Sequence, residues 1–238
     1  MDERVDELRR PIRVISSIGF RRVSIQKGIH CMKRRHFAAL GLVLAAVVAA
    51  PIAQAAPQAP DEFIRELSND ILETAQKDAS LQNGDLGKVM ALVDSKILPH
   101  TNFRRMTASA VGRYWRQATP QQQQRLQDEF KLLLVRTYAG ALSQVKGLSV
   151  HLLPLRAKPE DTEVIVRTQV RGAGEPIQMD YRLEKVGDGW KIYDVNVLGI
   201  WLVENYRSTF AQEISKGGID GLINSLAERN KVAASARS

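Results

Sequence analysis

Cysteine is almost absent from this sequence, and histidine is scarce. The 238 residues contain one cysteine, Cys31, and four histidines. Because we expect Cys31 to lie outside the mature chain, disulfides and thiolate chemistry are excluded from the mature protein. His100 and His151 remain there, without metal-ligand spacing, and no glycine-rich phosphate loop follows a predicted strand. Nucleophilic triads and metal centres are therefore disfavoured, and we predict no cofactor and no catalytic residue.

An uninterrupted apolar run of membrane-spanning length is also missing. The longest run, Phe37 to Ala50, has fourteen apolar or small residues, whereas a membrane helix needs about 20. It follows the basic start at Met32 and precedes the Ala-x-Ala pattern that ends at Ala55, which is typical of a signal peptide. We predict an over-extended N-terminus over residues 1–31 and a signal peptide over 32–55, with either general secretory or twin-arginine export.

Excess acidic or basic charge is nearly absent once the leader is set aside. The whole chain has a formal net charge of +8. Residues 1–55 hold 10 Lys and Arg against 4 Asp and Glu, and residues 56–238 hold 24 against 22, so the mature net charge is only +2. Nucleic acid is therefore not an expected partner. The span from Arg104 to Lys146 carries eight basic residues against two acidic ones, which fits either a solvated helix face or a surface that attracts anions.

Apolar residues that recur at helical spacing fill the first half of the mature chain. Stripes predict helices from Asp61 to about Ala75, from Leu86 to about Leu98, and from Phe103 to Gly112. Thr119, Pro120 and Gln122 form a capping box that starts the longest predicted helix, which is expected to reach Lys146.

Alternating apolar and polar residues fill the second half and predict four strands. The last of them contains two apolar pairs, Trp190 with Ile192 and Val195 with Val197, which are out of phase. A β-bulge at Tyr193-Asp194 would bring both pairs to one face. We therefore predict an α+β fold: a four-stranded antiparallel meander covered on one face by several helices that enclose an apolar cavity, all within one domain over residues 56–230, with a polar tail over 231–238.

Two motifs carry a family resemblance. The first is Trp-Lys-Ile-Tyr-Asp-Val-Asn-Val over residues 190–197, continued by Gly199, Leu202-Val203, Asn205-Tyr206-Arg207 and Phe210. The second is Val-Gly-Arg-Tyr-Trp-Arg-Gln-Ala-Thr over residues 111–119. Together they resemble the MlaC family of periplasmic phospholipid-binding proteins, also called toluene-tolerance auxiliary proteins. Trp201 stands where the family often has serine.

The resemblance implies a non-enzymatic carrier that works in the periplasm. Such a protein holds acyl chains in an apolar cavity and shuttles phospholipid between an outer-membrane lipoprotein-porin complex and an inner-membrane ABC transporter with an MCE-domain subunit, which maintains outer-membrane lipid asymmetry. Arg207 would either contact the headgroup or bond to backbone carbonyls. The candidate lining residues come from stripes predicted to face one another: Val93, Ile97, Phe103, Met106, Phe130, Leu134, Tyr138, Val164, Val166, Met179, Tyr181, Val195, Val197, Trp201, Leu202 and Tyr206.

Two other functions remain open at this point. A small-molecule isomerase or dehydratase on a cone-shaped α+β fold would need a buried acid or histidine at its cavity base, for which Asp194 is a candidate unless its carboxylate bonds to backbone or arginine. A protein-binding adaptor would have a filled core and an exposed apolar patch.

Overall fold

The computed structural model describes residues 58–235. The predicted start site, signal peptide and cleavage point lie outside these residues. None of the helices in the described part of the chain combines the length and the apolar character that a membrane span requires.

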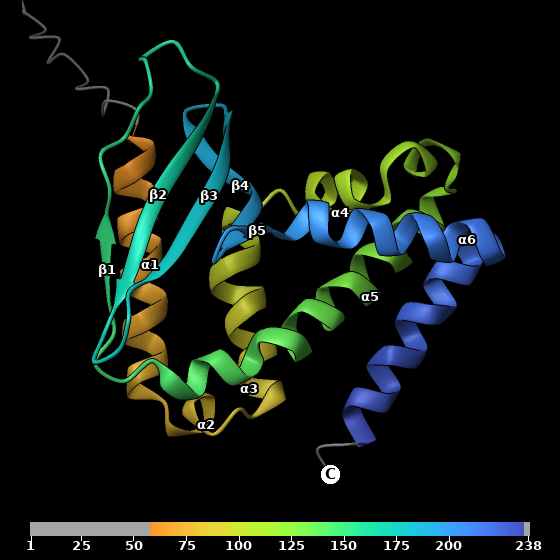
Figure 1. Cartoon of the computed structure of the whole chain (residues 1–238), viewed down its shortest axis with the longest axis horizontal. Coiled ribbons are helices and arrows are strands. Elements are labelled where there is room, and N and C mark those ends of the chain that lie inside the picture. The colour runs from red at the N-terminus through yellow and green to blue at the C-terminus, as the bar shows by residue number, and fades with distance from the viewer. Residues whose placement is uncertain (1–57, 236–238) are drawn as a thin grey trace, which may run out of the picture. The chain divides into compact units, whose positions relative to one another are not determined.

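Helical segments precede the sheet, and one long helical segment follows it (Figure 1). The α-helices before the sheet are α1 (Pro60–Lys77), α2 (Ala79–Gln82), α3 (Leu86–Leu92), α4 (Phe103–Val111) and α5 (Pro120–Tyr138). Short π or 3-10 segments join them: η1 (Val93–Ile97), η2 (Leu98–His100), η3 (Gly112–Gln117) and η4 (Ala139–Gln144). The sheet consists of β1 (Ser149–Leu152), β2 (Glu163–Arg171), β3 (Ile177–Val186), β4 (Gly189–Val197) and β5 (Ile200–Trp201), and α6 (Leu202–Ser235) closes the chain.

The strands form an antiparallel sheet in the order β1-β2-β3-β4-β5. The predicted α+β class and antiparallel meander are confirmed, but the number of strands was wrong, because the sheet has five strands and not four. The additional strand arises because Leu198 and Gly199 both adopt positive φ, at 53° and 88°. This tight turn pairs Ile200 with Val197 before the helix begins, and a strand of two residues has no periodicity to detect.

The predicted β-bulge is present. Arg182 pairs with Asp194 and Leu183 pairs with Ile192, which leaves Tyr193 as the extra residue of β4. Val195 then faces Tyr181, and Val197 faces Met179. Because directly opposed residues share a face of the sheet, the bulge puts both apolar pairs of β4 on the same face.

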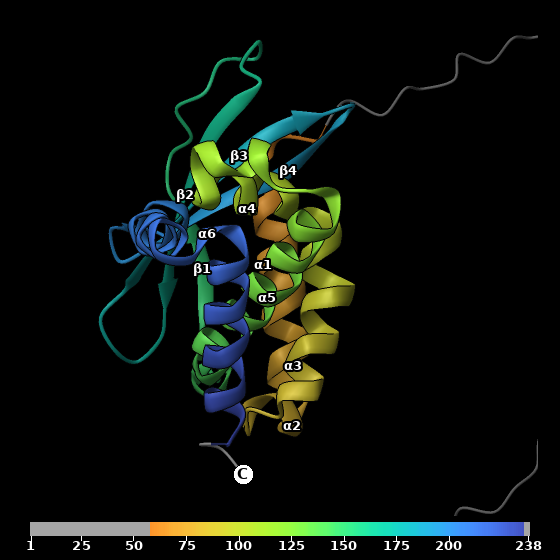
Figure 2. The same ribbon diagram turned by 90° about the vertical axis from the view of Figure 1, so that its right-hand side faces the viewer.

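Helix α1 covers part of that apolar face. Its Phe63, Ile64 and Leu67 pack with Leu183 and Ile192 of the sheet. The other end of α1 packs with α2, α3 and α5, and a separate cluster joins α4, α5 and α6. Figure 2 shows that α5 runs from the region of α4 toward the end of the domain near α2. The helices therefore bury three apolar clusters, only one of which includes the sheet.

One helix prediction was wrong about where the helix ends, and α6 contains a break. The capping box of Thr119 and Gln122 starts α5 as expected, but the α-helix ends at Tyr138 and continues only as 3-10 turns to Gln144. Glycine at 140 follows this end, and its backbone freedom disfavours a continuing α-helix. In α6, Gly218 breaks the helix with φ of 66°. The part after the break extends to Ser235.

Candidate functional site

The apolar face of the sheet is sealed at one end and partly open at the other. Leu183 and Ile192, near the β3–β4 hairpin, are 0% and 4% exposed. Further along the same face, Met179, Tyr181, Val195 and Val197 are only half-buried. Val166 and Thr168, which pair with Tyr181 and Met179, are 1% and 0% exposed, and Tyr181 and Val195 pack against the cluster that α1 forms with the sheet. This part of the face is therefore only partly accessible, through the exposed surface that the four half-buried side chains keep.

Tyr181 and Thr168 carry polar groups on this half of the face. Burial raises the pKa of the Tyr181 phenol, and hydrogen bonds with Ser68 and Thr168 oppose that rise. A phenol with a raised pKa stays neutral at physiological pH. Tyr181 therefore adds a hydroxyl to the apolar surface without adding a charge.

The helical segments also contribute apolar side chains that keep exposed surface. Tyr138 at the end of α5 is 40% exposed, and burial of the rest of its ring raises the pKa of its phenol. Leu134, one turn earlier, and Val93 and Ile97 of η1 are half-buried. These residues belong to the set predicted to contact acyl chains.

Five other predicted lining residues are buried, and one of them, Phe130, packs against the predicted residues Phe103 and Tyr206. Phe130 lies 5.0 Å from Tyr206 and 5.8 Å from Phe103, between ring centroids, where α4, α5 and α6 meet. The buried residues are Met106, Phe130, Val164, Val166 and Leu202. Their side chains hold the helices and the sheet together in the structure as it stands.

Trp201 lies on the opposite, polar face of the sheet. It pairs with Asn196, and the Arg182 guanidinium carbon lies 3.9 Å from the centre of its ring. At the position where the family often has serine, Trp201 therefore makes a cation–π contact with Arg182.

Asp194 also lies on the polar face, where it is 1% exposed. Its carboxylate accepts hydrogen bonds from the backbone N–H groups of Val203 (3.1 Å) and Val195 (2.9 Å) and from Arg182 (2.9 Å). The bond from Val203 caps the first turn of α6. The structural role is confirmed: this carboxylate holds β4, Arg182 and α6 together and does not face the apolar side of the sheet, where an isomerase would need its acid.

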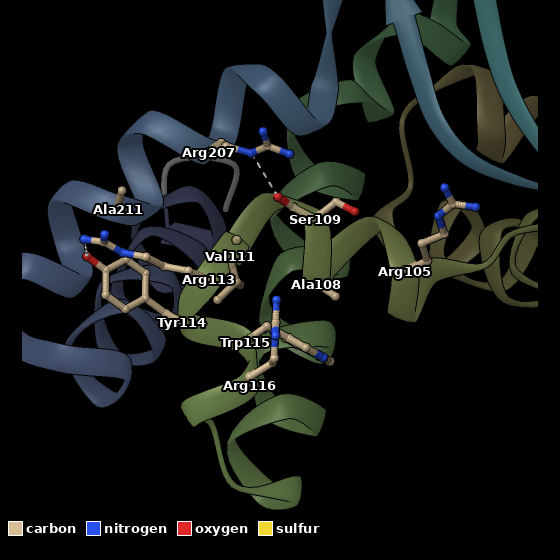
Figure 3. A pocket seen from close by; sticks show the side chains of 11 residues that line it. Arg105, Ala108, Ser109, Val111, Arg113, Tyr114, Trp115, Arg116, Arg207 and Ala211 are labelled. Atoms are coloured by element: carbon tan, nitrogen blue, oxygen red, sulfur yellow. Dashed lines mark hydrogen bonds between the residues drawn. The ribbon is translucent and has the colours of Figure 1, made fainter.

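Arg207 bonds to a backbone carbonyl, which was one of its two predicted roles. Its Nε donates to the Ser109 carbonyl oxygen over 3.1 Å and so ties α6 to α4. Next to this bond is a pocket of about 640 Å³ (Figure 3). Its lining residues are Arg105, Ala108, Ser109, Val111, Gly112, Arg113, Tyr114, Trp115, Arg116, Arg207 and Ala211.

Sequence reasoning did not find this pocket, and its lining includes none of the predicted lipid-contact residues. The available signal was the basic excess from Arg104 to Lys146. Two arginines of that span, Arg113 and Arg116, line the pocket together with Arg207. Arg207 lies on α6, which begins about 90 residues later in the sequence. That juxtaposition depends on the packing of α6 against α4.

The described residues contain no cluster of three or more histidine, cysteine, aspartate or glutamate side chains able to hold a metal ion. What the fold provides is an antiparallel sheet with helices on its apolar face and apolar surface left partly uncovered. These features define a class of protein, the α+β domain with an apolar surface at its sheet.

Comparison with known proteins identifies the family. The MlaC protein family matches residues 65–228, and the chain belongs to it. The chain is 23% identical over 198 residues to the toluene tolerance protein ttg2D of Pseudomonas putida, covering 80% of this chain and 92% of that protein. It is 21% identical over 197 residues to the intermembrane phospholipid transport system binding protein MlaC of Haemophilus influenzae, covering 81% and 92%.

A solved structure is similar over the whole of its own length. The phospholipid-binding protein of Ralstonia solanacearum, determined in complex with a phospholipid, is 49% identical, with a TM-score of 0.71. The match covers 73% of this chain and 98% of that one. The α+β fold of the described residues is thus shared with a protein that holds a phospholipid.

Proposed function

We propose that this chain is a periplasmic phospholipid carrier that holds acyl chains in a cavity against the half-covered apolar face of the sheet. The observation that carries the proposal is the uncovered surface of Met179, Tyr181, Val195 and Val197, beside sealed residues of the same face. The phospholipid complex of the Ralstonia relative supports the same chemistry. Fifteen of the sixteen predicted residues are proposed as the lining, with the half-buried ones contacting the chains first. Trp201 is left out because it lies on the polar face of the sheet.

The energetics suit reversible transfer. Moving an acyl methylene from water into an apolar site gains about 0.8 kcal/mol, so ten buried methylenes gain about 8 kcal/mol before ordering costs. A bilayer offers nearly the same environment, so moving the chain from bilayer to carrier changes the free energy little. A carrier of this kind therefore keeps lipid out of water and still releases it.

The proposed route follows from the family and the relatives' names. The Haemophilus relative is named as a component of an intermembrane phospholipid transport system. We propose that this chain receives phospholipid from, or delivers it to, an outer-membrane lipoprotein-porin complex and an inner-membrane ABC transporter with an MCE-domain subunit, and so helps to maintain outer-membrane lipid asymmetry.

Filling the uncovered surface tests the proposal. Met179→Trp places an indole on the half-buried part of the apolar face, whereas Gln178→Trp places the same indole on the exposed opposite face of β3. We expect Met179→Trp to lower the rate of fluorescent phospholipid transfer between donor and acceptor vesicles about tenfold, with Gln178→Trp close to wild type. Equal transfer by both variants and wild type, with unchanged melting temperatures, would place the acyl chains elsewhere.

A further inference from the structure

Three arginines around the pocket between α4, η3 and α6 have no carboxylate partner in the described part of the chain. Arg113 and Arg116 of η3 and Arg207 of α6 are exposed, and no Asp or Glu lies within ion-pair distance of any of them. By contrast, Arg105 at the pocket's edge is ion-paired with Glu163 and Glu184. No acidic residue lines the pocket.

Compensation of the α4 helix dipole does not explain this charge. The C-terminal end of α4 lies at Gly112, and its carbonyl groups carry a partial negative charge of about half a unit. The Arg207 bond to the Ser109 carbonyl already satisfies one of these groups. Three guanidinium groups supply a charge of about +3, so most of the positive charge remains without a counterpart among residues 58–235.

Local backbone structure places these side chains in the lining of one pocket. Gly112 has φ of 66° and ψ of −138°, a conformation that residues with a Cβ rarely adopt. The sharp break that it allows between α4 and η3 puts Arg113 and Arg116 in the lining of the pocket to which Arg207 also belongs (Figure 3). Tyr114 accepts a hydrogen bond from Arg113 over 3.0 Å, which orients that guanidinium.

The chemistry of the pocket fits a phosphate group. A guanidinium presents paired N–H donors that match two oxygens of one phosphate, and several arginines around a concave site can share its three or four oxygens. We propose that Arg113, Arg116 and Arg207 form a binding site for the phosphate group of a phosphate ester or of free phosphate. This site is distinct from the apolar face and does not depend on acyl-chain binding.

Calorimetric titration of the delipidated protein tests the site with three probes. These are sn-glycerol 3-phosphate, inorganic phosphate and dihexanoyl phosphatidylglycerol. We expect sn-glycerol 3-phosphate to bind, more weakly as salt rises from about 20 mM to about 300 mM. Preference for the glycerol ester and the short-chain lipid over phosphate would identify the source as a lipid headgroup, and equal binding of phosphate would identify it as free phosphate.

Variants separate the site from general charge effects. Arg113→Gln/Arg116→Gln removes two of the arginines, and we expect it to raise the Kd for sn-glycerol 3-phosphate at least about tenfold. Arg207→Lys keeps the charge but loses the paired donors and should raise Kd by a smaller factor. The matched control is Arg125→Gln, since Arg125 is exposed on α5 and lies outside the pocket.

Two results would overturn the proposal. One is a Kd for sn-glycerol 3-phosphate that is the same in wild type, the double variant and the Arg125 control, with all three folded. The other is binding of a polyglutamate peptide that depends on Arg113 and Arg116 while no phosphate probe binds, which would make the pocket a site for acidic protein. Because sn-glycerol 3-phosphate has no acyl chains, neither result bears on the lipid carrier proposal.

Discussion

At the scale of single residues, Asp194 shows how one buried carboxylate organises a junction. Its three hydrogen bonds reach Val195 in its own strand, Val203 at the start of α6, and Arg182 on the neighbouring strand. Arg182 in turn lies over the ring of Trp201. The Asp194 side chain therefore links the end of the sheet to the start of the last helix.

Removing that carboxylate should destabilise the fold. We expect Asp194→Ala to lower the free energy of unfolding by about 2–3 kcal/mol, because a helix cap is lost and buried donors are left unsatisfied. Urea denaturation of the mature protein measures this loss. Asp128→Ala, on an exposed position of α5, is the control and should change stability by less than about 0.5 kcal/mol.

The Asp194 carboxylate should also make the unfolding free energy depend on pH. Burial raises the pKa of Asp194 above its ordinary value of 3.8, against the opposing effect of its hydrogen bonds and of Arg182. The folded state therefore holds this proton at a pH where the unfolded state has released it, and the resulting stability is lost as the pH rises through the folded-state pKa.

Asp194→Asn cannot titrate and isolates this effect. As the pH falls toward about 4, the wild type should gain unfolding free energy relative to the variant. Paired urea denaturation at several pH values measures the difference. If the wild type instead lost unfolding free energy relative to the variant on acidification, the ion pair with Arg182 would lower the pKa of Asp194 by more than burial raises it.

At the scale of elements, the turn from β4 to β5 is built from an unfavourable residue. Leu198 is 66% exposed and has φ of 53°, a left-handed conformation that suits asparagine or glycine at the first position of a two-residue hairpin turn. Its side chain therefore gains little from packing while its backbone is strained.

Replacing this leucine should stabilise the protein. We expect Leu198→Asn to raise the unfolding free energy by about 0.5–1 kcal/mol, since Asn-Gly is favoured in such turns. Thermal and urea denaturation measure the gain. Leu198→Ala removes the same exposed apolar surface but keeps the strained backbone, so an equal gain in that variant would assign the effect to exposure and not to the backbone.

Elements with a clear period were predictable from the sequence, and those set by tertiary contacts were not. The bulge at Tyr193 followed from two out-of-phase apolar pairs, and the start of α5 followed from the side chains of Thr119 and Gln122. The two residues of β5 have no period of their own. The end of α5 at Tyr138 was missed because the apolar stripe continues through the 3-10 turns that follow it.

At the scale of the whole molecule, the described residues combine an apolar face with a separate basic pocket. Sequence patterns predicted residues of the apolar face, such as Met179 and Val197, because the alternation of side chains along a strand fixes which face they share. The pocket could not be predicted, because Arg113 and Arg207 are brought together only by the packing of α6 against α4. Which of the sixteen predicted residues contact acyl chains likewise depends on packing between segments. Trp201 is an example, because its contact with Arg182 places it on the polar face.

The most direct test of phospholipid carriage is mass spectrometry of the protein exported to a bacterial periplasm, first under native conditions and then after organic extraction. We predict a native mass that exceeds the mature polypeptide by one bound phospholipid, with phospholipid recovered in stoichiometric amount in the extract. A protein that is purified without lipid and stays empty when incubated with phospholipid vesicles would contradict the carrier function.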